Sequence, residues 1–477
     1  MKKSKFLIPL LLVLVVFLAA CGRGNDAGTG QGAGAAGQGA GGALPPLTTE
    51  NIELVFTTFG VDQPVLDLVA EAFTRNHPNI VVHAIELNTF YYSDNFHLMA
   101  ADGMLPDVFK VQDIVGWTLN GWLMDITELV DNDPRVDLIG DAYMHLGQFH
   151  GVRTALPIYS HPILAVLNVD YFDRFNEPIP TLEEWNWDLA LEIAERISRP
   201  QEMMFGIGKS GFFATENYLH NARAFLSGDR ARYGWLQGDG YVFCQDWIDL
   251  VNLRNDLHAR GIIDNATAEQ KYSILGENVN LADRGFTAIS FKDFWEVDDM
   301  LAAPFDVVVY PFPTRPGGRQ PVGSDMAGIS AITPHPREAY EFLMFFYYSD
   351  EAWAIKLDWW ADGDNELGQW VDRMPNSAVG GEARQRFEEV FGVENWAAIY
   401  NATVNNAQVG TLHTPGVRAF QRWRGEGGYW GQLLNWSAPE LFPVDVADEF
   451  TTRINDFYRI EMDLLEAVMP TLNRFTW

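Results

Sequence analysis

The stretch from residue 52 to residue 113 constrains the fold more than any other part of this chain. Three short apolar runs, "IELVFTTF", "NIVVHAIEL" and "PDVFKVQD", have the length and composition of buried strands. Two helical patterns separate them, one from Gln63-Pro64 to His77-Pro78 and one that ends at Gly103. Strand, helix, strand, helix, strand in this order predicts a parallel sheet that is covered by helices on both faces. The chain is therefore expected to be an α/β protein.

A second α/β unit is expected further along the chain. Thr181 and Glu184 have the spacing of a capping box, which predicts a helix that continues to about Ile197. Strands and helices then alternate through "FGIGK", "TENYLHNARAFLSG", "QDWIDLVNLRNDLHARG", "FTAISF" and "FDVVVYPFP". The segment "GISAIT", from Gly328, returns to the first unit before a helical tail that is rich in tryptophan over residues 353–436. The body has about 430 residues, which is more than a single hydrophobic core usually serves. Two lobes are therefore expected.

The amino terminus has the pattern of an export signal. MKKSK is followed by an uncharged run from Phe6 to Ala20, which is too short to span a membrane. Leu18-Ala19-Ala20-Cys21 resembles the lipobox of bacterial lipoproteins, which implies cleavage after residue 20 and acylation of Cys21, with palmitate among the expected lipids. Residues 21–49 then form the lipidated cysteine and a flexible Gly/Ala-rich tether. An ordinary secretory signal with an unrelated cysteine is the alternative.

Charge and residue usage narrow the function. The formal net charge of −31 argues against nucleic acid as a partner, because a phosphate backbone is bound by Lys and Arg. Cys244 is the only other cysteine, so the mature body has no intramolecular disulfide, and a lone cysteine is more typical of a core than of a reactive site. The ten histidines form no metal-ligand spacing, so no metal is expected.

The segment "FGIGKSGFF" raises the question of a nucleotide site. Gly206, Gly208 and Gly211 have the G-x-G-x-x-G spacing, and Lys209 with Ser210 resembles the end of a P-loop. A complete P-loop needs glycine at position 203, where this chain has Met203. An exported protein also meets little ATP or NAD, so no nucleotide or other cofactor is expected.

Four motifs, in their order, resemble the group-one extracellular solute-binding proteins of ABC transporters, which are relatives of maltose-binding protein. These motifs are "LPDVFKVQD…GWLMDITELV", "FHGVRTALPIYSHPILAVLNVDYFD", "LADRGFTAISF" and "VYPFPTRPGG…GSDMAGISAI…PREAYEFLMFFYYSDEA". The resemblance implies a type II periplasmic-binding-protein fold, with two α/β lobes that a hinge joins and a ligand cleft between them. It places lobe I at residues 50–158 and 325–375 and lobe II at residues 159–324 and 376–477. The crossing strands are expected near Ile158 to His161 and Val322 to Asp325.

The resemblance also implies a function. The chain is expected to be a receptor that is not an enzyme, that captures a carbohydrate, such as an oligosaccharide, by hinge closure, and that delivers it to permease subunits. It would act as a monomer, anchored by lipid on the extracellular face of the cell membrane, or on the periplasmic side if the cell has an outer membrane. In this family Gly206 and Gly208 would let the backbone approach the ligand.

Ligand contacts are expected at the carboxyl ends of the predicted strands, from aromatic rings and from groups that bond hydroxyls. The candidates are Phe59, Asn88, Tyr91, Asp113, Tyr159, Lys209, Phe213, Asp293, Trp295, Asp325 and Trp360. For each candidate, core packing or helix capping is the alternative, and Asp113 in particular stands where it could cap a helix that begins at Ile114.

Two other functions stay open from the residues alone. A secreted glycoside hydrolase would need two carboxylates that flank a bond, and Glu183-Glu184 or Asp298-Asp299 could be nominated. Adjacent residues of a helix point in different directions, so these pairs are better explained as solvated faces. A receptor of the same scaffold for a peptide or a metal is the third interpretation.

Overall fold

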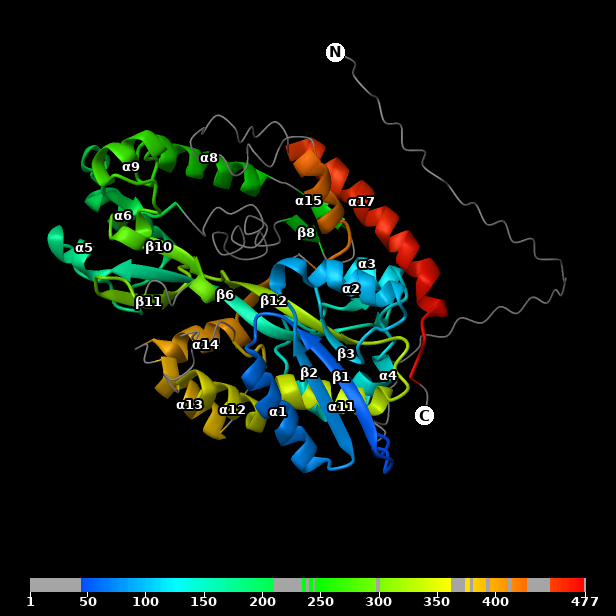
Figure 1. Ribbon diagram of the computed structural model, residues 1–477. Coiled ribbons are helices and arrows are strands. Elements are labelled where there is room, and N and C mark those ends of the chain that lie inside the picture. The colour runs from blue at the N-terminus through cyan, green and yellow to red at the C-terminus, as the bar shows by residue number, and fades with distance from the viewer. Residues whose placement is uncertain are drawn as a thin grey trace, which may run out of the picture. The chain divides into compact units, whose positions relative to one another are not determined.

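The computed structural model describes residues 44–209, 234–236, 240–242, 245–296, 301–361, 374–377, 381–391, 395–410, 413–426 and 447–475 (Figure 1). Its main sheet is ordered β2-β1-β3-β12-β6-β10-β7, with β11 also paired to β6 and β13 to β12. These strands are β2 (Ile80–Glu86), β1 (Ile52–Thr58), β3 (Val108–Val111), β12 (Gln320–Ile329), β6 (Leu156–Asn168), β10 (Thr287–Asp293), β7 (Phe205–Ile207), β11 (Val307–Pro311) and β13 (Ala407–Val409).

The alternation predicted for residues 52–113 is confirmed. β1 pairs in parallel with β2 and with β3, and the connections contain α1 (Gln63–Asn76), α2 (Tyr92–Ala101) and the short 3-10 helix η1 (Thr89–Tyr91). The apolar stripe of α1 faces a core in which Phe73 lies 5.2 Å from Phe342 of α11 (Pro336–Tyr348), measured between ring centroids. Phe96 of α2 stacks on Trp117 of α3 (Ile114–Leu119) at 4.1 Å. Figure 1 shows α1 and α11 on one side of these strands and α2 and α3 on the other.

A single long strand, β6, connects the two parts of the sheet, and all its residues are buried. Its first half pairs antiparallel with β12, where Tyr159 is opposite Asp325 and His161 is opposite Gly323. Its second half pairs antiparallel with β10 and β11. The two segments that were predicted to cross between the lobes are thus neighbours in one antiparallel pair.

Two large hydrophobic clusters meet along β6, where Leu164 and Val166 belong to the first cluster and Ala165 and Leu167 belong to the second. The first contains α1, α3 and α11 with strands β1 to β3, and the second contains α6 (Trp187–Ile197), β10 and α15 (Val417–Glu426). The lobe boundaries stay a prediction. The clusters, however, disagree with the boundary predicted at residue 376. Phe387 of α13 (Gly381–Phe391) and Trp396 of α14 (Trp396–Asn405) belong to the first cluster, although residues 376–477 were assigned to lobe II.

The last helix, α17 (Ala447–Val468), contributes to both clusters. Phe450 and Ile454 pack in the second cluster, whereas Leu465 packs in the first. Contacts of α17 with α3 and α15 agree with this arrangement. The helix therefore forms a further connection between the two cores, beside β6 and β12.

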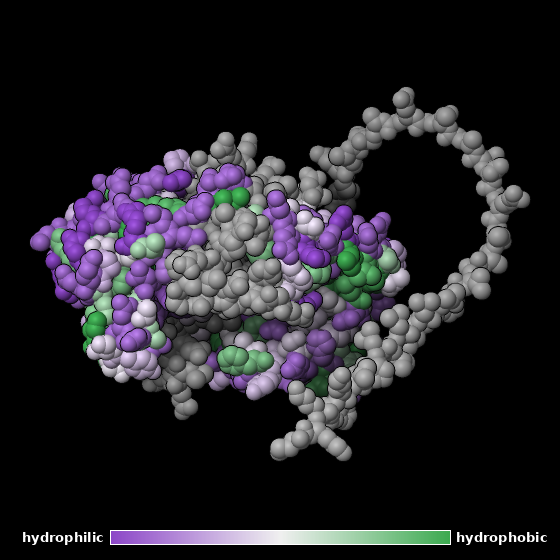
Figure 2. Space-filling view, turned by 90° about the horizontal axis from the view of Figure 1, so that it is seen from above, coloured by the Kyte–Doolittle hydropathy of each residue, from purple (hydrophilic) through white to green (hydrophobic). Residues whose placement is uncertain are grey.

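The remaining elements are mostly short. They are α4 (Thr127–Asp131), β4 (Gln148–Phe149), β5 (Val152–Arg153), α5 (Val169–Arg174), β8 (Gly234–Leu236), β9 (Gly240–Val242), α8 (Gln245–Ala259), α9 (Ala268–Leu275), η6 (Phe294–Glu296) and α12 (Asp350–Ala361), with 3-10 turns at Pro134–Leu138, Pro200–Glu202, Ala282–Arg284 and Met469–Thr471. None of the helices in the described ranges is both long and apolar enough to cross a membrane. Hydrophilic residues cover most of the described surface in Figure 2, as the acidic composition requires.

The start of α6 differs from the prediction. Asn186 caps the helix by accepting a hydrogen bond from the Leu189 amide at 3.0 Å. The Glu184 carboxylate accepts one hydrogen bond from the Thr181 amide, at 3.0 Å, and one from the Thr181 hydroxyl, at 2.8 Å. Both bonds lie within a turn that precedes the helix. The pair therefore stabilises the approach to the helix and does not cap it. The segment "TENYLHNARAFLSG" lies outside the described residues.

Candidate functional site

One carboxylate joins three strands at the crossing of the sheet. Oδ2 of Asp325, on β12, lies 2.6 Å from the ammonium of Lys110 on β3 and 2.9 Å from Nε2 of His161 on β6. The Lys110 side chain is 1% exposed and the Asp325 side chain is 22% exposed. Asp325 therefore compensates a buried charge and still presents part of its carboxylate to solvent, where its oxygens can accept hydrogen bonds from a ligand.

Aromatic rings contact two members of this charged cluster, Lys110 and His161. The Lys110 ammonium lies 3.7 Å from the ring centroid of Phe59, which follows β1 and contacts Tyr92 at 4.7 Å. The His161 ring lies 5.1 Å from the ring of Trp295, measured between centroids, in an edge-to-face arrangement. Trp295 belongs to η6, directly after β10, and is 49% exposed. An exposed indole beside a carboxylate suits a ligand that has both apolar faces and hydroxyl groups.

Of the predicted contacts, the structure brings together Phe59, Asp325 and Trp295. Asp293 is close in sequence to Trp295 and its amide donates to the Glu296 carboxylate at 3.2 Å, which orders the turn that carries the indole. Tyr159 is different, because its ring is 1% exposed and packs against Tyr347 at 5.1 Å in the first core. In this structure Tyr159 is a core residue, and its ring is not available to a ligand.

Asp113 caps the helix that follows it, as the alternative from the sequence states. Its Oδ1 accepts a hydrogen bond from the Gly116 amide at 3.1 Å, at the start of α3. The same oxygen lies 4.0 Å from Nε of Arg418 on α15. Arg418 also donates to the carbonyl of Gln112. These contacts connect an element of the first cluster with one of the second, and a ligand contact of Asp113 stays a prediction.

A buried histidine, His413, hydrogen-bonds to the backbone of β12. Nε2 of His413 donates to the Ser324 carbonyl at 2.7 Å, and the Ser324 hydroxyl donates to the Tyr159 carbonyl at 3.0 Å. Burial lowers the pKa of His413 to about 4, and the nearby Arg418 guanidinium acts in the same direction. His413 is therefore neutral at physiological pH and acts as a hydrogen-bond donor to β12.

The glycines of "FGIGK" have a structural role that differs from the one implied by the resemblance. A Cβ at Gly206 would clash with the backbone of Ala194, so glycine is needed there for β7 to pack against α6. At Gly208 an added Cβ would meet the hydroxyl of Ser290 instead of open space. Packing within the protein thus accounts for both glycines, and the approach of a ligand to this backbone stays a prediction. Burial lowers the pKa of Lys209, and the carboxylate of Asp264 partly offsets this effect.

Three other candidates are not joined to the cluster by any described contact. Asn88 caps η1 by accepting from the Phe90 amide at 3.0 Å, and Tyr91 at the end of η1 is exposed. Trp360, on α12, is partly buried against the first cluster. Their roles as ligand contacts stay predictions. Phe213 and the lipidation candidate Cys21 lie outside the described residues.

Sequence reasoning missed Lys110 and His161. Both stand inside otherwise apolar strands, "DVFKV" and "IYSHPILAV", where a buried ionisable side chain needs a partner. That conflict was a usable signal, although the identity of the shared partner, Asp325, was not available from the sequence.

The described residues show no metal centre, and of the two carboxylate pairs nominated from the sequence only Glu183-Glu184 is described. No group of three or more His, Cys, Asp or Glu side chains within the described ranges could hold a metal ion. Glu183 and Glu184 are exposed in the turn before α6, and Asp298-Asp299 lies outside the described part of the chain.

Comparisons with known proteins agree with this architecture. A family model described as bacterial extracellular solute-binding protein matches residues 60–353. The cyclic alpha-maltosyl-1,6-maltose binding protein from Arthrobacter globiformis is similar in structure, with a TM-score of 0.63 and 15% identity over 86% of this chain and 99% of that one. An ABC substrate-binding protein from Listeria monocytogenes in complex with cycloalternan has a TM-score of 0.58 and 16% identity over 88% of this chain and 99% of that one.

A third similar structure is the maltose/maltodextrin-binding domain from Bdellovibrio bacteriovorus bound to maltotriose. It has a TM-score of 0.54 and 16% identity over 86% of this chain and 100% of that one. No curated protein sequence matches the chain significantly. The α/β fold of periplasmic solute-binding proteins, expected from the sequence, is thereby confirmed.

Proposed function

Because the chain belongs to the bacterial extracellular solute-binding proteins, we propose that it is the receptor of an ABC importer and that its solute is a carbohydrate of oligosaccharide size. One observation carries the choice of a carbohydrate. The partly exposed carboxylate of Asp325 contacts both Lys110 and His161. The Lys110 ammonium lies over the ring of Phe59, and the His161 ring contacts the half-exposed indole of Trp295.

The chemistry of these side chains matches that of a sugar. A sugar ring presents hydroxyl groups at its edge and C–H groups on its faces, so it needs acceptors beside flat apolar surfaces. Asp325 offers charge-assisted hydrogen bonds, which are stronger than neutral ones, and Trp295 offers a face. The three similar structures described above are named for sugar ligands, which supports the same class.

Hinge closure would couple binding to transport. Phe59 follows β1 and Lys110 belongs to β3, both strands of the first cluster. Trp295 follows β10, whose Phe291 packs in the second cluster, and stands next to Phe294, which packs in the first. A sugar that contacts both sides would stabilise the closed arrangement, because only differential affinity for two states shifts their equilibrium. The bending would occur where β6 and β12 pass between the lobes, near residues 158–161 and 322–325. The two lobes predicted from the sequence would meet at this point.

Export and anchoring complete the proposal. Removal of residues 1–20 and acylation of Cys21 would attach the receptor to the membrane, and the tether of residues 21–49 would let the body reach the permease subunits. For residues 1–43 the support is the sequence pattern alone, because they lie outside the described structure. The predicted end of the tether at residue 49 is too late, because Leu44 and Leu47 pack against the first cluster and the Pro45 carbonyl accepts a hydrogen bond from Arg337 at 2.9 Å. The receptor would work as a monomer on the extracellular face of the membrane.

A thermal-shift screen of the mature chain against sugars, peptides and divalent metals tests the function. We expect an oligosaccharide, such as maltotriose or a cyclic glucan, to raise the melting temperature and to be recovered intact by chromatography. Consumption of the sugar would identify an enzyme, and a shift with peptide or with a metal that a chelator reverses would identify the third interpretation.

A further inference from the structure

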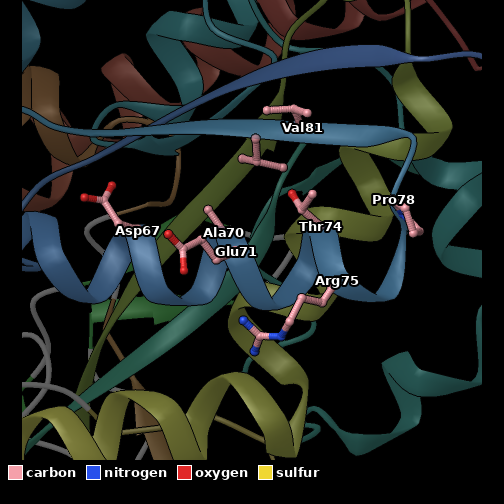
Figure 3. Close-up of a pocket in the computed structure, with 8 residues that line it drawn as sticks. Asp67, Ala70, Glu71, Thr74, Arg75, Pro78 and Val81 are labelled. Atoms are coloured by element: carbon pink, nitrogen blue, oxygen red, sulfur yellow. The ribbon is translucent and has the colours of Figure 1, made fainter.

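The outer edge of β2 lies beside an open pocket (Figure 3). β2 is the last strand of the main sheet and, within the described structure, pairs only with β1. The pocket has a volume of about 650 Å³ and lies between β2 and α1, with Asp67, Glu71 and Thr74 on the helix side and Val82 on the strand side. In Figure 3 the side chains of Asp67 and Thr74 rise from α1 toward the strand, whereas Arg75 points away.

The backbone of β2 alternates between its partner strand and this pocket. In a parallel ladder, alternate residues direct both backbone groups toward the neighbouring strand. The Leu87 amide donates to the Thr58 carbonyl at 2.8 Å, and the Asn79 carbonyl accepts from the Ile52 amide at 2.9 Å. Odd-numbered residues therefore face β1, and the even-numbered residues of β2 direct their amide and carbonyl groups outward.

Side chains of α1 cover both ends of this outer edge. Gln63 donates to the Ala84 carbonyl at 2.8 Å and accepts from the Glu86 amide at 2.9 Å. The Thr74 hydroxyl donates to the Ile80 carbonyl at 3.0 Å. These bonds confirm that the backbone groups of the even-numbered residues point outward. They also provide hydrogen-bond partners for the backbone groups at the two ends of the edge.

The centre of the edge is left open. Neither the amide and carbonyl of Val82 nor the amide of Ala84 has a hydrogen-bond partner outside the β1 ladder among the residues that the structure describes. Beneath them, Asp67 and Glu71 occupy the same stripe of α1 as Gln63, at helical spacings of four residues. A free strand edge of this kind is a template for pairing with another chain.

We propose that this open edge is a docking site for an extended, basic segment of a partner protein, which adds as a short strand beside Val82. Such a segment supplies the missing backbone donor and acceptors. Its side chains alternate between two faces. Those on the α1 side meet Asp67 and Glu71 and are Lys or Arg, whereas those on the other side lie against Val81 and Ile85, which are exposed apolar residues. The site is separate from the proposed sugar site and does not depend on it.

A second copy of this chain is a poorer occupant. Pairing of β2 with β2 would bring the carboxylates of Asp67 and Glu71 from both copies to one seam, between two bodies of net charge −31. Like charges that face each other across a strand pair are destabilising. The charge of the groove therefore favours a partner of opposite sign.

The probe for the test is a fluorescent decapeptide of alternating lysine and valine, titrated into the mature chain and followed by anisotropy. We expect saturable binding that weakens with added salt. Hydrogen exchange at the Val82 and Ala84 amides should slow at least tenfold at saturation. Asp67→Lys with Glu71→Lys should weaken binding at least tenfold. The matched control, Asp463→Lys with Glu466→Lys on exposed positions of α17, makes the same charge change and should stay within twofold.

A backbone variant separates strand addition from charge attraction. Ala84→Pro removes one outward amide and leaves the β1 ladder intact, so it should weaken peptide binding while sugar binding and the melting temperature stay near those of the wild type. If this variant does not fold, the exchange data and the charge variants decide. Equal binding of a glutamate–valine peptide, or of the lysine–valine peptide to Asp67→Lys with Glu71→Lys, would overturn the proposal. Sedimentation that shows a dimer seated on this edge would identify a second copy as the occupant and also overturn it.

Discussion

The imidazole Nε2 of His161 lies 2.9 Å from Oδ2 of Asp325, across the antiparallel pairing of β6 with β12. The same oxygen lies 2.6 Å from the Lys110 ammonium, so one atom connects the two crossing strands to β3. Asp325 therefore has two roles that mutation can separate, because it compensates a buried charge and also exposes part of its carboxylate to the proposed ligand.

Replacement of Asp325 should first affect stability. In Asp325→Asn the buried Lys110 ammonium loses its counter-charge, and we expect the free energy of unfolding in urea to fall by roughly 3 kcal/mol. The double variant Asp325→Asn with Lys110→Met removes both charges and should recover much of that loss. Equal destabilisation in the single and double variants would show that the ion pair is not the cause.

Asp113 offers a test that separates capping from ligand contact. Asp113→Ala removes the bond to the Gly116 amide, so the free energy of unfolding should fall by about 1 kcal/mol. Asp113→Asn retains a good N-cap and removes the charge, so its urea melt should match the wild type. If the carboxylate contacts the sugar, Asp113→Asn should lower affinity about tenfold, since a charge-assisted hydrogen bond contributes roughly 1.5–3 kcal/mol. Wild-type affinity in Asp113→Asn would remove Asp113 from the ligand contacts and leave it a structural role.

His413 predicts a specific pH dependence of stability. Its folded pKa of about 4 lies below the ordinary value of 6.5, so between these values the unfolded chain binds a proton that the folded chain does not. Stability should therefore fall as the pH falls from 6.5 to 4, with a contribution of roughly 3 kcal/mol from this group. His413→Gln keeps a donor for the Ser324 carbonyl and cannot titrate. Urea melts across this range should show a smaller loss in the variant, and parallel curves would contradict the assignment.

The anchor is tested by fractionation of cells. Cys21→Ala removes the acylated thiol, so the protein should leave the membrane fraction while its melting temperature, measured on the purified chain, stays unchanged. Ala19→Gly keeps a small residue before the cysteine and serves as the control that should remain attached. Retention of the Cys21→Ala variant in the membrane fraction would contradict the lipoprotein assignment.

Local elements were predictable because their signals are local. Gln63-Pro64 and His77-Pro78 bracket a helix that the structure places at Gln63–Asn76, and the apolar runs on either side became β1 and β2. The start of α6 was misplaced because Thr181 and Glu184 satisfy each other in a turn that has the same spacing as a capping box. The spacing of the two residues is the same in a turn and in a capping box, and only the backbone conformation distinguishes these two structures.

The site was only partly predictable. The rule that ligands meet the carboxyl ends of strands nominated Phe59, Asp325 and Trp295, which the structure brings together. It also nominated Tyr159, whose ring turns into the core because side chains of a strand buried on both faces have no solvated side. The partnership of Lys110 with Asp325 depends on the register of β12 against β6 and β3, a long-range feature that spacing along the chain does not reveal.

Calorimetric titration of the mature chain with the oligosaccharide that the thermal screen selects tests the central claim most directly. The account predicts one bound sugar per chain and, in Trp295→Ala, affinity lower by about tenfold or more, as loss of an aromatic face would cause. Tyr272→Ala, which removes an exposed ring on α9, is the matched control and should bind like the wild type. Absence of sugar binding, or unchanged affinity in Trp295→Ala, would contradict the assignment of this cluster as a carbohydrate site.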